Sequence, residues 1–183
     1  MKSVGASSPT EDDGVRRRTI GITLIAVGLA GLIGTWGPFS GARGDLTCTA
    51  PALPGETVDV SLSDMGGMMG SGHMLSVVAS PSAVAPGEVS FIVRNTGVMV
   101  HEFLVLPLPP GGAGSRTVGP GGRVSEAGSL GEASASCAEG TGAGITPGSV
   151  SWVALRMASG RYELICNEPG HYAAGMFTEL DVR

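Results

Sequence analysis

The run C-N-E-P-G-H-Y-A-A-G-M near the C-terminus contains Cys166, His171 and Met176, with four residues between successive members. Thiolate, imidazole and thioether donors together favour copper. The ligand set of electron-transfer copper sites is a plane of two histidines and one cysteine, with a methionine as a weak axial ligand. A second histidine is therefore needed. His101 is the candidate, because it starts the run H-E-F-L-V-L after F-I-V-R-N-T-G.

The segment N-T-G-V-M-V-H-E-F, taken with C-x4-H-x4-M, resembles the cupredoxin superfamily. The ligand loop is similar in length to those of rusticyanin and the sulfocyanins, and longer than that of plastocyanin. The resemblance covers residues 56–183 apart from an insertion. It implies a Greek-key β-sandwich holding one type 1 (blue) copper, with His101, Cys166, His171 and Met176 as its ligands.

The resemblance also implies a role for each side of the site. His171 is expected to be the partly exposed ligand through which electrons enter and leave, surrounded by Pro169, Tyr172, Ala173 and Ala174. Cupredoxins often place Asn or Ser after the upstream histidine, whereas Glu102 stands there in this chain. The reduction potential is therefore not predicted.

The elements that must position these donors are short strands. Gly is 31 and Pro 12 of 183 residues, and aromatics make up only 4%, which suits strands joined by tight turns. In the run 90–94, Phe91 and Val93 point to one side, and Ser90, Ile92 and Arg94 point to the other, as expected of a strand with one buried and one mixed face. Seven runs of this kind predict an all-β sandwich: 57–62, 74–79, 88–95, 102–106, 150–157, 161–166 and 177–182.

Residues 107–148 interrupt this pattern with a sequence rich in Gly, Ser and Pro. They predict a long surface insertion with a short helix near residues 130–136. Loops of this length are often functional, but the composition indicates no chemistry, and we interpret the insertion as an excursion without a role in the site.

Cys48 and Cys137 remain once Cys166 is assigned to metal, and in an oxidising compartment they could pair. The sequence leaves that pairing open.

The N-terminus has the pattern of a targeting segment. Arg16, Arg17 and Arg18 precede an uncharged run over residues 19–40, about the length that spans a bilayer. Residues 1–40 are thus predicted to contain a hydrophobic helix, residues 41–55 a linker, and residues 56–183 an extracytoplasmic domain in the periplasm or at the cell surface. A retained membrane anchor, a cleaved signal and a twin-arginine signal all remain open.

Residues 65–74 form a segment rich in methionine. Its candidate donors are Met65, Met68, Met69, His73 and Met74. These side chains could bind Cu(I) as an accessory or loading site, or they could serve packing and docking. The first interpretation supports an alternative function in copper storage or delivery.

Several function classes are disfavoured. A net charge of −5, with no basic cluster beyond the N-terminus, does not suit a nucleic-acid-binding protein. A copper oxidase or nitrite reductase needs a second copper centre with histidines beside the cysteine, yet Ile165 and Asn167 flank Cys166 and the chain has three histidines. The sequence therefore predicts a non-enzymatic carrier of single electrons. Its expected partners are redox proteins, such as a respiratory complex or a cytochrome.

Overall fold

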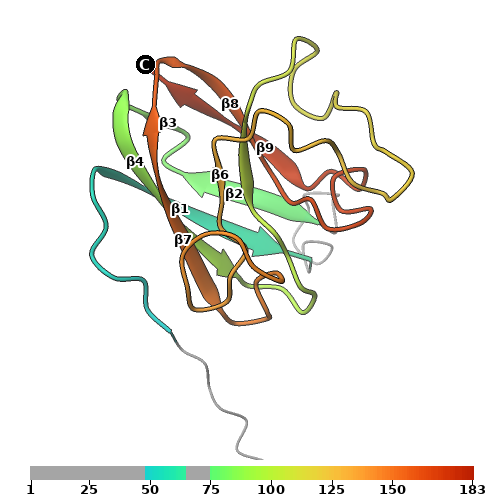
Figure 1. Ribbon diagram of the computed structural model, residues 1–183, viewed down its shortest axis with the longest axis horizontal. Helices are drawn as coiled ribbons and strands as arrows, with labels where there is room; N and C mark the ends of the chain where they lie inside the picture. Colours follow the sequence, from blue (N-terminus) through green and yellow to red (C-terminus); the bar gives the residue numbers. More distant parts are fainter. Residues whose placement is uncertain (1–47, 65–74) are drawn as a thin grey trace, which may run out of the picture. The chain divides into compact units, whose positions relative to one another are not determined.

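The computed structural model describes residues 48–64 and 75–183, and in this part of the chain two β-sheets pack face to face (Figure 1). The first sheet has the order β2-β1-β4-β7 and the second the order β3-β9-β8-β5-β6. The strands of the first sheet are β1 (Glu56–Ser63), β2 (Ser76–Ser80), β4 (Gly87–Asn95) and β7 (Val150–Met157). Those of the second are β3 (Ala83–Val84), β5 (Leu104–Pro107), β6 (Gly131–Glu132), β8 (Gly160–Ile165) and β9 (Phe177–Val182).

The predicted all-β fold of two sheets is therefore confirmed. Most neighbouring strands are antiparallel, but β1 runs parallel to β4, and β3 runs parallel to β9. The predicted N-terminal helix and the methionine-rich segment lie outside the described residues. Within the part of the chain that is described, no helix is long and apolar enough to cross a membrane.

The main core lies between the sheets. Val58 of β1, Phe91 of β4, Leu164 of β8 and Leu180 of β9 are all fully buried in one cluster. The rings of Phe91 and Phe103 lie with their centroids 5.4 Å apart. The alternation predicted over residues 90–94 is thus present, with Phe91 and Val93 facing the core. Cys166 and Met176 belong to the same cluster, which places the candidate ligands at one end of the core.

The helix predicted near residues 130–136 is wrong. Gly131 and Glu132 instead form β6, which pairs with β5. The amides of Leu130 and Ala133 extend this pairing by donating hydrogen bonds to the carbonyls of Val105 and Phe103, at 2.8 and 2.9 Å. Backbone groups on the edge of β5 need partners, and this long-range pairing overrides the weak local helix propensity of the segment.

The insertion also differs from the prediction, because it is not a separate excursion. Val124 is buried against Leu104, Ile165 and Tyr172, so the insertion covers the outer face of the second sheet beside β5 and β8.

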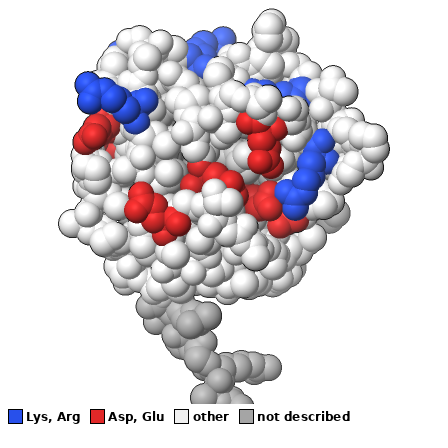
Figure 2. All heavy atoms as spheres, in the orientation of Figure 1, with Lys and Arg blue, Asp and Glu red and all other residues white. Residues whose placement is uncertain are grey.

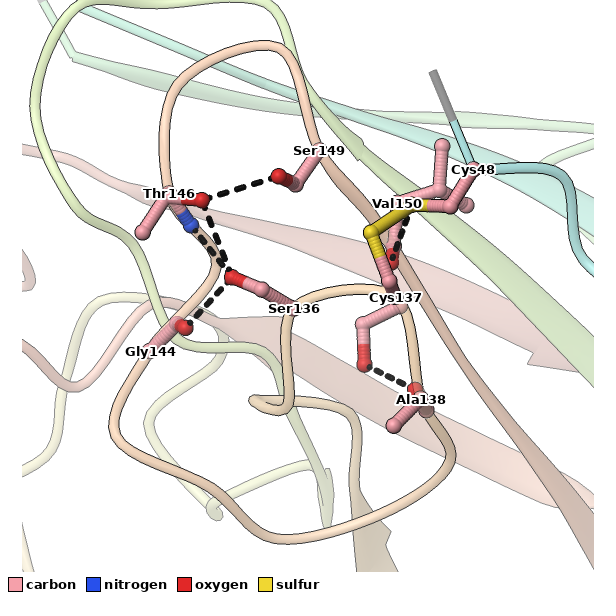
Figure 3. The surroundings of a disulfide bond; sticks show 9 residues. Cys48, Ser136, Cys137, Ala138, Gly144, Thr146, Ser149 and Val150 are labelled. Carbon is pink, nitrogen blue, oxygen red and sulfur yellow. Dashed lines mark hydrogen bonds between the residues drawn. A yellow bond between two sulfur atoms is a disulfide. The ribbon is translucent and has the colours of Figure 1, made fainter. Parts of the chain in front are cut away.

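A disulfide bond joins Cys48 to Cys137 and thus ties the segment before β1 to the insertion (Figure 3). Close to it, the hydroxyl group of Ser136 contacts Thr146, which in turn contacts Ser149.

Candidate metal centre

Three buried side chains converge at the end of the core. The ligand atoms of His101, Cys166 and His171 all lie within 4.8 Å of one another. The Nδ1 atoms of the two histidines are 3.2 Å apart, and Cys166 Sγ lies 3.4 Å from His171 Nδ1 and 3.8 Å from His101 Nδ1. Two imidazole nitrogens and one sulfur therefore face a common point. This group could hold a metal ion, and its donor types fit a type 1 copper site.

The loop after β8 places two of these donors. Cys166 follows the last residue of β8, and its amide donates to the carbonyl of Met176 at 3.0 Å. The amide of Met176 donates to the carbonyl of His171 at 3.1 Å, which closes the loop on itself. The loop turns at Gly170, whose φ of 84° suits glycine. The short spacing in sequence thus becomes a compact turn carrying Cys166 and His171.

The third donor is fixed by a residue that is distant in sequence. His101 and Ile145 form an isolated antiparallel bridge. The His101 amide donates to the Ile145 carbonyl at 3.2 Å, and the His101 carbonyl accepts from the Ile145 amide at 2.7 Å. Ile145 belongs to the insertion. The insertion therefore helps to hold the backbone of His101 in place.

Met176 is fully buried and directly precedes β9. Its place in the core cluster together with Cys166 agrees with a position beside the three converging donors. Its role as the axial ligand stays a prediction. The suggested accessory donors Met65, Met68, Met69, His73 and Met74 lie outside the described residues.

Burial sets the protonation of the metal-free site. Desolvation lowers the pKa of His101 to about 4, with a further contribution from the nearby His171, and it also lowers the pKa of His171. Desolvation raises the pKa of the Cys166 thiol to about 12. At neutral pH both imidazoles are thus uncharged and the thiol carries its proton. A cation bound here would meet two free nitrogen lone pairs and would displace the thiol proton.

The Cys166 sulfur also has a backbone partner. The amide of Glu102 donates to Cys166 Sγ at 3.3 Å. Such a bond favours the thiolate over the thiol. Because Glu102 directly follows His101, the segment that carries this histidine also donates a hydrogen bond to the Cys166 sulfur.

Asp64 is a site residue that the sequence did not reveal. Its carboxylate accepts hydrogen bonds from the amides of Val98 and Met99, and Oδ2 lies 3.7 Å from His101 Nε2. His101 Nε2 has no hydrogen-bond partner among the described residues. The negative charge favours a proton on Nε2, which leaves the Nδ1 lone pair facing Cys166 and His171. Asp64 directly follows β1, at a distance in sequence that no local pattern connects to His101.

The surface around His171 differs in part from what the resemblance implied. His171 is only 6% exposed. Pro169, Ala173 and Ala174 are exposed, as expected of a small apolar surface, but Tyr172 is buried. Its hydroxyl donates to the carboxylate of Glu163 at 2.9 Å, which turns the polar end of the ring inward. A shallow hollow beside the loop is lined by Tyr172, Ala173, Ala174, Gly175 and Phe177, and by Gly114, Arg116 and Val118 of the insertion.

Asn95 anchors the loop that leads to His101, and its loss should destabilise the domain. Its buried amide nitrogen donates to the carbonyls of Met99 and Ile145, both at 2.7 Å. We expect Asn95→Ala to lower the free energy of unfolding of the copper-free protein by about 1–3 kcal/mol, because the hydrogen bonds from this side chain to the Met99 and Ile145 carbonyls are lost. Urea denaturation measures the change. Arg94→Ala, which changes an exposed side chain of the preceding residue, is the control, and an equal loss in both variants would contradict the role of Asn95.

No family model matches the chain, and no curated protein matches its sequence. Among solved structures, a reduced auracyanin from the photosynthetic bacterium Roseiflexus castenholzii has 14% identity and a TM-score of 0.47, over 72% of this chain and 99% of that one. Auracyanin B has 19% identity and a TM-score of 0.47, over 75% and 95%. Rusticyanin from Thiobacillus ferrooxidans has 20% identity and a TM-score of 0.43, over 75% and 86%.

The predicted resemblance to cupredoxins is confirmed in that the similar solved structures include auracyanins and rusticyanins, and the descriptions of one rusticyanin and of auracyanin A name copper proteins. At these values the superpositions carry no weight for the chemistry of this chain. The case for copper rests on its own converging side chains.

Proposed function

We propose that this chain is a type 1 copper protein of the cupredoxin kind that carries single electrons between redox partners outside the cytoplasm or at the membrane. His101, Cys166, His171 and Met176 are its copper ligands. The observation that supports this function is the convergence of two Nδ1 atoms and one thiol sulfur within 4.8 Å in a buried site. The copper, when bound, supplies a one-electron cycle between Cu(II) and Cu(I).

The remaining features of the site suit electron transfer. The bridge between His101 and Ile145 and the closed loop from Cys166 to Met176 hold the donors in place before metal binds. A site that is held in this way rearranges little when the oxidation state changes. Because these donor side chains are buried, little water can reach the metal site. Ile165 and Asn167 beside Cys166 supply no further imidazole, which favours a carrier over an enzyme.

We further propose that the partners dock near the exposed Pro169, Ala173 and Ala174, because weak redox encounters use small interfaces. Respiratory complexes and cytochromes are the expected classes. On the face shown in Figure 2, the basic side chains lie apart from one another and form no continuous patch. Residues 1–40 would export the domain or anchor it, residues 41–55 would link it, and residues 56–183 would form the Greek-key domain.

Retention of copper through repeated redox cycles tests this function against copper delivery. The full chain is loaded with one copper, then reduced and reoxidised repeatedly in the presence of a Cu(I) chelator. A carrier is expected to keep about one copper per chain, and a variant with Met65, Met68, Met69 and Met74 replaced by leucine is expected to do the same. Loss of the copper to the chelator on reduction, at a rate that depends on these methionines, would instead support delivery.

A further inference from the structure

Arg123 of the insertion bridges two carboxylates that flank the metal site. Its Nη1 lies 2.5 Å from Glu102 Oε2, and its Nη2 lies 3.0 Å from Glu168 Oε2. Glu102 directly follows His101, and Glu168 stands two residues after Cys166. One guanidinium group therefore links the segment of the upstream histidine to the loop that carries the other donors.

The residues around Arg123 strengthen this link. The carbonyl of Gly122 accepts a hydrogen bond from the Gly170 amide at 2.8 Å. The amide of Val124 donates to Asn167 Oδ1 at 2.9 Å, and Asn167 Nδ2 donates back to the Val124 carbonyl at 3.2 Å. Residues 122–124 thus contact the ligand loop at both sides of Glu168. The fit is tight at Gly122, where an added Cβ would lie 3.1 Å from the Gly170 nitrogen and where φ is 73°.

The two carboxylates also matter for the charge of the site. The side chains of Glu102 and Glu168 are only 12% and 20% exposed, so their fields are weakly screened. Negative charges held this close to the metal site would favour the more positive Cu(II) state over Cu(I). Arg123 lies against both and opposes their effect.

We propose that Arg123 is a positioning residue of the metal site that ties the ligand loop to the His101 segment and, by offsetting Glu102 and Glu168, raises the reduction potential. This inference rests on the proposed copper function. In the reaction used to test it, ferrocyanide would give one electron to Cu(II) and become ferricyanide. With Arg123 removed, two partly buried negative charges act on the site without compensation.

Equilibrium redox titration of Arg123→Met tests the electrostatic part. At a fixed ratio of ferricyanide to ferrocyanide, the ratio of Cu(II) to Cu(I) is expected to rise by about tenfold in this variant, because charges at short range in a protein interact by a few RT. Adding Glu102→Gln and Glu168→Gln to the same chain should return the ratio toward the wild-type value. Arg156→Met, which removes an exposed arginine from β7, is the matched control and should leave it unchanged.

Further variants keep the test decisive. If Arg123→Met does not fold, Glu168→Gln with Arg123 in place should shift the ratio in the opposite direction, toward Cu(I). In the copper-free protein, hydrogen exchange at the Gly170 and Val124 amides should be faster in Arg123→Met than in the wild type, which tests the positioning part without metal. An unchanged Cu(II) to Cu(I) ratio in blue Arg123→Met, or an equal shift in Arg156→Met, would overturn the proposal. A wild-type chain that never becomes blue would sink the copper function itself, while the exchange measurement would still report on the link.

Discussion

Replacing Cys166 by serine is expected to weaken Cu(I) binding by more than about 100-fold and to abolish the intense visible band of the Cu(II) protein. Loss of an outer partner of a metal ligand alone typically costs 10–100-fold in affinity, and a serine hydroxyl is a hard donor that keeps its proton where a soft thiolate is needed. Competition with a Cu(I) chelator measures the affinity, and absorption spectroscopy measures the band.

The Cys166→Ser variant is expected to fold, so a loss of copper binding would reflect the loss of the ligand. Cys166 is fully buried and receives the Glu102 amide, which a serine oxygen can accept as well, so the fold should survive. A double variant with Cys48 and Cys137 changed to serine controls for general loss of cysteine and should keep the band. If Cys166→Ser bound Cu(I) as tightly as the wild type, copper would have to be held elsewhere in the chain.

The Cys48/Cys137 double serine variant is itself expected to lose about 2–5 kcal/mol in free energy of unfolding, the usual range for a native disulfide. The bond closes a separation of 89 residues, so its loss frees the unfolded chain considerably. It also unties the segment before β1 from the insertion, close to the Ser136–Thr146–Ser149 hydroxyl contacts (Figure 3). Urea denaturation in oxidising and reducing buffer measures the change.

Reducing buffer provides the internal control for this second prediction. The wild type should lose the same stability when it is reduced, whereas the double variant should respond little to the reductant. Equal stability of both proteins in oxidising buffer would contradict a stabilising disulfide between Cys48 and Cys137.

The ligand loop was the part of the site most open to sequence reasoning. Cys166 and His171 lie five positions apart around a Pro-Gly turn, so their convergence depends mainly on local geometry. His101 needed more, because its nearness to Cys166 depends on the long-range pairing of β5, which follows His101 in the chain, with β8. There the resemblance, and not spacing, supplied the assignment. The strands were likewise predictable from alternation, as Phe91 and Val93 illustrate.

The surroundings of the ligands could not be predicted, because they depend on long-range contacts. Asp64 lies 37 positions before His101, and Arg123 lies 45 positions before Glu168. Each is a single charged residue in a segment without periodicity, where no local signal separates a site residue from a solvated one. The helix expected near residues 130–136 failed for a related reason, since pairing of Gly131 with the edge of β5 decided its structure.

The composition of the insertion likewise did not predict its contacts with the metal site. A sequence rich in Gly, Ser and Pro suggested a segment without a role, yet its backbone pairs with His101 through Ile145 and with the ligand loop through Gly122 and Val124. Glycine permits such close approaches because it has no side chain. The low complexity of the insertion is therefore compatible with tight packing against the site.

The visible absorption spectrum of the purified chain, loaded with one equivalent of Cu(II), tests the central claim most directly. The geometry of His101, Cys166 and His171 predicts an intense band near ~600 nm that a mild reductant bleaches and an oxidant restores, as expected of copper bound to thiolate in this ligand class. A colourless protein that binds copper without this band would contradict a type 1 site, and with it the proposed role in electron transfer.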